Sequence, residues 1–191
     1  MTTTPILLAS GSPRRRELLE QLGLRFAVAA PDVDETPLPG EAPVAYVQRL
    51  AVEKAHAVVA AADMLVIAAD TTVDLGGDIL AKPVDAADAS AMLHRLSART
   101  HRVHTGVAVR LGDRTVAETI TSLVTFTPLS AELIAWYVAT GEPLDKAGAY
   151  AVQGAGGAFV QRVQGSVSNV IGLPLHTVVR LAGELGVALL G

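Results

Sequence analysis

The segment from Leu7 to Leu19 constrains this chain most, because it reads as a buried strand, a tight turn and a helix in succession. The apolar run ends at Ala9, Gly11 permits backbone angles that a side chain would resist, and Pro13 suits the first position of a helix. Ser12 is a natural N-cap residue. The unpaired amides of such a helix start, together with the positive end of the helix dipole, form a place where an anion can bind.

Three arginines, Arg14, Arg15 and Arg16, fall in the first turn of this predicted helix, where the dipole favours acidic side chains. Their positive charges reduce helix stability unless a negative partner is present. We therefore expect a ligand that carries phosphate groups, which guanidinium groups bind well. The alternative is an ordinary junction between a strand and a helix, with a solvated basic patch.

The composition limits the number of domains and the kinds of partner that this chain can have. The chain has 191 residues, of which 50% are hydrophobic and 18% are charged, enough for one domain or for two lobes on one sheet. We find no internal repeat or linker and treat residues 1–191 as a single domain. The net charge of -4 disfavours nucleic acids and anionic membranes as partners, and without cysteine the chain has no thiolate chemistry. The short apolar runs and the lack of a targeting signal predict a cytoplasmic protein.

Lysine is rare in this arginine-rich chain and occurs as Lys54, Lys82 and Lys146. An ammonium group on a flexible stem binds phosphate as a point charge, whereas a guanidinium group forms a planar fork. The lysines are therefore candidate phosphate ligands, although three ordinary surface lysines would give the same pattern. Lys54 follows Glu53 on a helix predicted over 42–62, and adjacent helical residues point in different directions, so we expect only one of the two to face a shared pocket.

Two acidic residues are candidates for work on a phosphate. Asp70 follows the apolar run from Met64 to Ala69, which has the length of a buried central strand. An acid at the carboxyl end of such a strand lies where open α/β sheets bind ligands, although an Asp that caps the following turn is also common. Glu35 lies in a proline-rich loop, where it is either solvated or faces the phosphate site and helps to hold a divalent cation.

The remainder of the chain reads as strands and helices with one glycine-rich segment, between 141 and 157. Such glycines suggest a close approach of the backbone to a ligand, and Gln153 among them offers a donor and an acceptor to a nucleobase edge. The predicted elements are strands over 25–30, 101–110, 115–127 and 159–163, a hairpin over 72–80, helices over 86–96, 130–140 and 174–185, and a loop over 165–172.

The histidines and large aromatic residues have simpler explanations. His101 and His104 cannot share a face on one strand, and no histidine lies at metal-ligand spacing from another. We therefore expect histidines that are hydrogen-bonded or face solvent. Trp136 and Tyr137 are expected in the core.

Taken in order, the polar segments resemble the Maf family of nucleoside triphosphate pyrophosphatases over nearly the whole chain. Each motif alone is weak, and the ordered set is specific. The resemblance is carried by Leu8–Arg15, Asp34–Glu35, Glu53–Ala55, Ala69–Thr71, Lys82–Pro83, Thr105–Val107, Asp145–Tyr150, Gln153–Gly154 and Val170–Leu175.

The resemblance implies an α/β fold like that of inosine triphosphate pyrophosphatases, with a long mixed sheet flanked by helices and a central cleft between two lobes. It also implies hydrolysis of a nucleoside triphosphate between its α- and β-phosphates, which yields the monophosphate and pyrophosphate. A divalent metal, Mg²⁺ or Mn²⁺, is the implied cofactor. A homodimer is compatible with the sequence.

Three positions distinguish subgroups of this family. Arg14, Thr71 and Gln153 resemble the subgroup that acts on dTTP and UTP. The subgroup that acts on 7-methyl-GTP typically has an aromatic residue in place of Arg14 and Glu in place of Gln153. A glutamate carboxylate has no donor for a pyrimidine carbonyl, whereas the glutamine amide has both a donor and an acceptor.

The same resemblance implies the roles of the other polar residues. Asp70 orients or deprotonates the attacking water, and Glu35 and Asp70 bind the metal. Arg16 is left as a solvated helix residue. A preference for 7-methyl-GTP and a nucleotide-binding role in regulating cell division or septum formation are the alternatives. The triphosphate is held by Ser10, Ser12, Arg15, Lys54, Lys82 and Lys146.

Overall fold

The fold is that of a computed structural model, which describes residues 4–190. Three short 3-10 helices, η1 (Glu142–Asp145), η2 (Ala147–Ala149) and η3 (Ala155–Phe159), lie between Ala139 and Val160. The other elements are β1 (Ile6–Ala9), α1 (Pro13–Glu20), β2 (Ala27–Val28), α2 (Pro43–Ala57), β3 (Leu65–Leu75), β4 (Asp78–Leu80), α3 (Ala86–Leu96), β5 (Thr100–Leu111), β6 (Arg114–Phe126), α4 (Ala131–Ala139), β7 (Val160–Gln164), α5 (Val167–Ile171) and α6 (Leu175–Glu184).

The strands form a mixed sheet in the order β2-β1-β3-β5-β6-β7, and β4 pairs with β3. β1 is parallel to both β2 and β3, whereas the β3–β4 and β6–β7 pairs are antiparallel. This arrangement confirms the predicted α/β class with a long mixed sheet flanked by helices.

The chain divides into two compact units. Unit 1 comprises the chain up to Asp70, the segment Thr105–Ile120 and the chain from Gly172 onward. Unit 2 comprises Thr71–His104 and Thr121–Ile171. β3, β5 and β6 therefore each contribute residues to both units.

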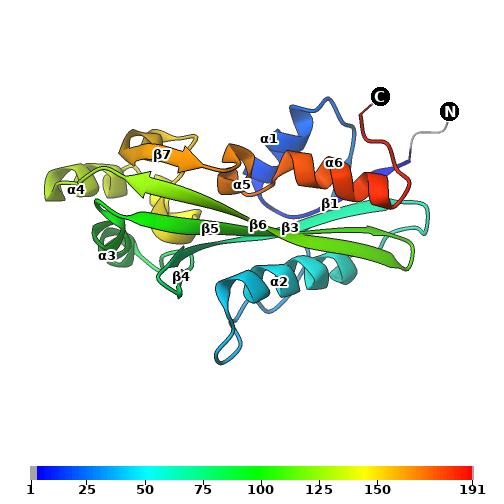
Figure 1. The fold of residues 1–191 in the computed structure, drawn as a ribbon, viewed down its shortest axis with the longest axis horizontal. Coiled ribbons are helices and arrows are strands. Elements are labelled where there is room, and N and C mark those ends of the chain that lie inside the picture. The colour runs from blue at the N-terminus through cyan, green and yellow to red at the C-terminus, as the bar shows by residue number, and fades with distance from the viewer. Residues whose placement is uncertain (1–3, 191) are drawn as a thin grey trace. The chain divides into compact units, whose positions relative to one another are not determined.

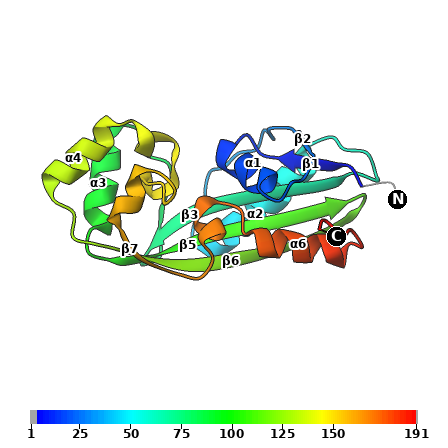
Figure 2. The same cartoon turned by 90° about the horizontal axis from the view of Figure 1, so that it is seen from above.

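In unit 1, α2 covers one face of the sheet, and α1 and α6 lie on the other (Figures 1 and 2). Side chains alternate between the faces along a strand. Ala9 of β1 pairs with Ala68 of β3, and both pack in one apolar cluster with Ala51 and Ala55 of α2. Small residues on both sides of this contact let the helix lie close to the sheet.

Gly106 of β5 marks the closest approach of α2 to the sheet. A β-carbon at this position would lie 2.5 Å from the carbonyl carbon of Val47 and 2.8 Å from the amide nitrogen of Gln48. Both atoms belong to the helix backbone and have little freedom to move. Glycine is therefore required here for packing.

In unit 2, the core forms where α3 and α4 pack against each other and against the sheet (Figure 2). Leu93, Ile134 and Phe159 are fully buried members of this core. Asp85 and Ser130 cap the two helices by accepting a hydrogen bond from the backbone amide three residues ahead. Among residues 4–190, no helix has the length and apolar character that crossing a bilayer requires.

Two predicted boundaries are wrong. The sequence predicted a strand that ends before Asp70 and a separate hairpin, but β3 runs without a break from Leu65 to Leu75. Its polar half stays extended because Val73 pairs with Leu80 of β4. The second error is the helix predicted over 42–62, since α2 ends at Ala57.

Two further expectations are corrected by tertiary contacts. The predicted loop over 165–172 contains α5, in which the buried Asn169 side chain donates to the carbonyl oxygen of Val103 at 3.1 Å. Tyr137 is buried as predicted, but the neighbouring Trp136 is 53% exposed. Adjacent positions on α4 point in different directions, so only one of these two rings can enter the core.

Candidate active site

The junction between β1 and α1 has the predicted geometry, with one exception. Pro13 begins α1, and Ser12 is the N-cap residue in an extended conformation. Across the described residues, however, the Ser12 side chain makes no capping hydrogen bond. Ser10 Oγ instead accepts a hydrogen bond from the Ser12 amide at 3.2 Å. The turn is thus ordered by the serine before the glycine and not by the one after it.

Arg15 is fixed in place at this junction. Its Nε donates to the carbonyl oxygen of Gly172 at 2.8 Å, and its Nη1 donates to Ser10 Oγ at 3.2 Å. Burial lowers the pKa of Arg15, the Asp70 carboxylate opposes that shift, and Arg14 and Glu35 act more weakly in opposite directions. A guanidinium keeps its proton across the physiological range. Arg15 is therefore a permanent, oriented positive charge.

The three arginines of α1 have different environments, as predicted. Arg16 turns to solvent, where its Nε donates to Glu20 Oε1 at 2.8 Å in an exposed pair one helical turn apart. Arg14 and Arg15 are half-buried. Only these two therefore remain candidates for ligand binding.

Lys54 is the centre of a charge cluster in unit 1. Its Nζ lies 2.6 Å from Oδ1 of Asp70 and 2.5 Å from Oε1 of Glu35. The side chains of Lys54 and Asp70 are 7% and 9% exposed, whereas that of Glu35 is 47% exposed. Charge-assisted hydrogen bonds of this kind are strong, and loss of the ammonium would leave a buried carboxylate unpaired.

The periodicities of strand and helix explain why these groups meet. Asp70 lies two residues beyond Ala68 on β3 and so points to the face that α2 covers. Lys54 lies on the buried stripe of α2, whereas the adjacent Glu53 is exposed and pairs with Arg49. The prediction that only one residue of the Glu53–Lys54 pair faces the site is confirmed, and it is the lysine.

Asp70 is not at the end of β3, contrary to the prediction, but its position has a similar consequence. The last residue of the neighbouring strand β1 is Ala9, which pairs with Ala68. Beyond that pair the β1 chain turns into the junction that begins with Ser10. Asp70 therefore lies on β3 beyond the last residue that pairs with β1, beside the predicted anion site. Among the described residues its Oδ2 accepts no hydrogen bond.

The loop that carries Glu35 is attached to α2 by a tyrosine that the sequence analysis missed. The hydroxyl of Tyr46 donates to the Glu35 carbonyl oxygen at 2.9 Å. Burial, reinforced by the charges of Asp70 and Glu35, raises the pKa of Tyr46 to about 12, so the hydroxyl keeps its proton. The tyrosine could have been noticed as a polar group on the apolar stripe of the predicted helix.

Glu35 and Asp70 fit a divalent cation in number and chemistry. Mg²⁺ is commonly held by one or two carboxylates together with water and substrate phosphate oxygens. Within the described chain no group of three or more acidic, histidine or cysteine side chains converges on one point. A metal at this place would therefore need ligands from outside the protein, which a triphosphate can supply.

Unit 2 carries the other predicted substrate residues. Lys146 is half-buried, and its Nζ donates to the carbonyl oxygen of Glu142 at 2.7 Å and to Oδ1 of Asp145 at 2.5 Å. Lys82 is exposed just after β4, and the carbonyl oxygen of Ala81 before it accepts from the Gly148 amide at 3.2 Å. Unit 2 thus brings the two lysine segments together.

Two predicted discriminating residues also belong to unit 2. Thr71 is its first residue and is half-buried, and Gln153 is exposed in a turn before η3. That the polar residues of unit 1 and unit 2 serve one substrate stays a prediction.

The order and spacing of these residues match a known protein family. Residues 5–185 match the family described as Maf-like protein. The chain belongs to the Maf family. The match spans every predicted site residue in both units, so the Maf assignment applies to the whole set.

Two relatives of this Maf protein carry the same name. It is 56% identical over 187 residues to the dTTP/UTP pyrophosphatase of Myxococcus xanthus, with 97% of this chain and 95% of the relative covered. It is 54% identical over 185 residues to the dTTP/UTP pyrophosphatase of Anaeromyxobacter dehalogenans, with 95% and 94% covered. The Ham1 protein of Staphylococcus aureus, a solved structure, is 19% identical, with a TM-score of 0.47 over 64% of this chain and 71% of that one.

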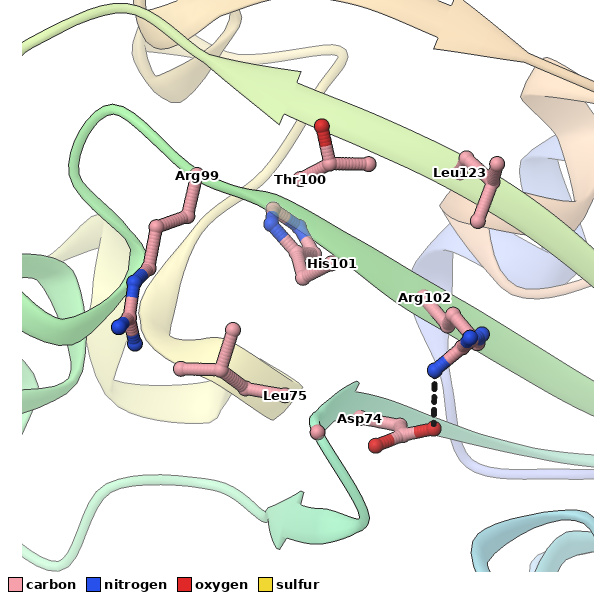
Figure 3. Close-up of a pocket in the computed structure, with 8 residues that line it drawn as sticks. Asp74, Leu75, Arg99, Thr100, His101, Arg102 and Leu123 are labelled. Carbon is pink, nitrogen blue, oxygen red and sulfur yellow. Dashed lines mark ion pairs between the residues drawn. The ribbon is translucent and has the colours of Figure 1, made fainter.

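The Maf protein also has a pocket in unit 2 that includes none of the predicted site residues. It measures about 550 Å³ and is lined by Asp74, Arg99, His101 and Arg102, among others (Figure 3). Arg102 faces Asp74, with Nη1 and Oδ2 3.7 Å apart. Two arginines and one aspartate therefore line this pocket, and Asp74 offsets the charge of Arg102.

The two histidines near this pocket have separate partners. His104 Nε2 lies 3.1 Å from Asp74 Oδ2, and His101 Nε2 lies 2.8 Å from the Tyr150 hydroxyl. Both side chains are buried. The prediction of hydrogen-bonded histidines is confirmed, with His101 Nδ1 left without a partner among the described residues.

Proposed function

We propose that this Maf protein hydrolyses nucleoside triphosphates, dTTP and UTP foremost, between the α- and β-phosphates. The products are the nucleoside monophosphate and pyrophosphate. The observation that carries the proposal is the Lys54 ammonium held between Glu35 and Asp70, in a chain 56% identical to a dTTP/UTP pyrophosphatase. This cluster combines a fixed cation with two carboxylates, as a phosphate-transfer site requires.

The triphosphate is held by fixed positive charge. Arg15 offers an oriented guanidinium at the start of α1, and the amides of that helix start add their partial charges. Lys54, Lys82 and Lys146 are the point charges of the site. Ser10 and Ser12 contribute hydroxyl groups at the same junction. As the leaving pyrophosphate gains negative charge, each of these contacts strengthens.

Asp70 acts on the water. Its Oδ1 is engaged by Lys54, which leaves Oδ2 to accept a proton. The water oxygen forms a bond to the α-phosphorus, the bond from that phosphorus to the bridging oxygen breaks, and the electron pair leaves with pyrophosphate. The proton of the water passes to Asp70.

Glu35 and Asp70 would hold the divalent cation, Mg²⁺ or Mn²⁺. When bound, such an ion neutralises phosphate charge and polarises the phosphoryl oxygens. Arg14, Thr71 and Gln153 select the nucleotide. The amide of Gln153 matches the O4 acceptor and the N3 proton of a thymine or uracil ring. The substrates are cytoplasmic metabolites, so we place the protein in the cytoplasm.

Purified protein, Mg²⁺ and a panel of nucleotides test the proposal. We expect turnover of dTTP and UTP with one pyrophosphate released per nucleotide, and loss of turnover in EDTA that Mn²⁺ or Mg²⁺ restores. A preference for 7-methyl-GTP would overturn the specificity. Nucleotide binding without hydrolysis would instead support a regulatory role.

A further inference from the structure

The turn that carries Gln153 is held at both ends by buried side chains of unit 2. Gln153 lies inside a turn closed by the hydrogen bond from the Gly154 amide to the Ala151 carbonyl oxygen, at 3.2 Å. The side chain of Gln153 is exposed and makes no hydrogen bond to the described residues. The backbone of the turn therefore sets where this side chain begins, and no hydrogen bond of its own does so.

The first end of the turn is fixed by Tyr137 of α4. The Tyr137 hydroxyl accepts a hydrogen bond from the Ala151 amide at 3.1 Å. The tyrosine ring is fully buried and packs edge-on against Phe159, with ring centres 4.8 Å apart. The hydroxyl is thus a rigid point of attachment.

The second end is fixed by Glu142 of η1. Its Oε2 accepts from the Ala155 amide at 3.0 Å, and its Oε1 accepts from the Gly156 amide at 3.1 Å. The Tyr137 hydroxyl donates to the same Oε1 at 2.7 Å. A continuous path of hydrogen bonds therefore joins the residues on either side of Gln153.

The glycines of the segment serve this attachment. A β-carbon at Gly154 would lie 2.6 Å from the carboxyl carbon of Glu142, and one at Gly156 would lie 2.6 Å from the Tyr137 hydroxyl. The close backbone approach predicted from the glycine density is, at these two positions, an approach to the protein's own side chains.

The protonation states keep each donor and acceptor in its role. Burial favours the neutral form of Glu142, but hydrogen bonds from Tyr137, Gly156 and Ala155 outweigh it and lower the pKa of the carboxyl group. Burial and the bond to Glu142 raise the pKa of Tyr137. At neutral pH the tyrosine donates and the carboxylate accepts.

We propose that Tyr137 and Glu142 are positioning residues that set nucleobase selectivity by holding the Gln153 turn. The inference rests on the proposed function, because it assumes that Gln153 contacts the base. Glu142 has a second link to the site, since its backbone carbonyl accepts from Lys146. A change confined to its side chain leaves that link in place.

The test compares dTTP with 3-methyl-dTTP, in which a methyl group replaces the N3 proton. Wild type should prefer dTTP, and Gln153→Ala should lose the preference. Tyr137→Phe and Glu142→Gln should each reduce the preference by about fivefold, the scale of one hydrogen bond. They should act through kcat/KM for dTTP, with little change for the analogue.

Tyr150→Phe is the matched control. It removes a buried hydroxyl from the same core, and that hydroxyl bonds His101 and not the Gln153 turn. We expect a loss of stability with an unchanged preference for dTTP. Amide hydrogen exchange supplies a readout that does not depend on activity. The amides of Ala151, Ala155 and Gly156 should lose protection in Tyr137→Phe and keep it in Tyr150→Phe.

The two proposals fail in different ways. If wild type turns over neither dTTP nor UTP, the proposed function is wrong, whatever the exchange data show. If wild type prefers dTTP but Tyr137→Phe slows both substrates equally, or leaves the exchange of the turn unchanged, the positioning role is wrong and the proposed function stands.

Discussion

The charge cluster of unit 1 and the Gln153 turn of unit 2 are built in opposite ways. In unit 1, Lys54 and Asp70 extend from α2 and β3, and their side chains are nearly buried and paired with each other. In unit 2, Gln153 is exposed in a turn whose backbone is held by two buried side chains. Groups on regular elements hold their geometry through the fold itself, whereas a loop residue depends on its supports.

This difference predicts how substitutions divide. Changes in the unit 1 cluster should lower turnover for every nucleotide, because the groups there act on phosphates that all nucleotides share. Changes in the turn should alter the ranking of nucleotides and leave phosphate chemistry in place. A substitution in the unit 1 cluster that changes the ranking of nucleotides, or one in the turn that slows turnover of every nucleotide equally, would contradict this comparison.

Asp70→Asn should have the largest effect. Asparagine retains an oxygen that can accept from Lys54 but cannot take a proton from water, so kcat should fall about 10³-fold for dTTP and UTP alike. Nucleotide affinity, measured by calorimetry, should persist. Asp78→Asn is the control, since that carboxylate is exposed and pairs with Arg95. If Asp70→Asn retains turnover, Asp70 is not the general base of the reaction.

Lys54→Met should come next. It removes the cation between Asp70 and Glu35, and the loss of one charge contact to the transition state typically raises the barrier by about 2–4 kcal/mol. We expect a kcat lower by about 10²-fold or more, together with a lower midpoint of urea unfolding, because Asp70 loses its partner in a dry site. Lys54→Arg should not rescue activity, since a planar guanidinium does not fit where an ammonium is enclosed. An unaltered kcat in Lys54→Met would contradict the assigned role.

A pH dependence of stability should originate in unit 2. Burial lowers the pKa of His101 to about 4, whereas an unfolded histidine titrates near 6.5. Between these values the unfolded state binds a proton that the native state does not, so the free energy of unfolding falls as the pH drops through this window. Above about pH 6.5 this contribution is complete.

The pH effect is measured by urea unfolding of wild type and His101→Gln at pH 7, 6, 5 and 4.5. The variant should lose less stability than wild type over this range. Parallel curves would show that the acid sensitivity arises elsewhere.

Gln153→Glu should have the smallest effect on phosphate chemistry and the clearest effect on selectivity. The carboxylate cannot donate to O4 of a pyrimidine, so the ratio of kcat/KM for UTP to that for 7-methyl-GTP should fall about tenfold, the scale of one or two hydrogen bonds. The KM and kcat for the two nucleotides give the ratio directly. An unchanged ratio would place base recognition elsewhere.

The parts of this molecule that could be predicted from sequence are those set by local rules. The β1–α1 junction follows from Gly11 and Pro13, and the choice of Lys54 over Glu53 follows from helix geometry. Both depend on residues close together in the chain. The long mixed α/β sheet, in contrast, was implied by the resemblance to the Maf family.

The parts that could not be predicted depend on tertiary partners. β3 continues past Asp70 because β4 pairs with its polar half, and α5 forms around a buried Asn169 whose partners lie far away in sequence. Tyr137 was expected in the core for its ring, while its hydroxyl carries the further role. Glu142 gave no signal except its place inside the glycine-rich segment.

Hydrolysis of dTTP in water enriched in ¹⁸O tests the central claim most directly. The account predicts dTMP and pyrophosphate as the only products, with one labelled oxygen in dTMP and none in pyrophosphate, because the water attacks the α-phosphorus. The label in pyrophosphate, or dTDP and phosphate as products, would contradict it.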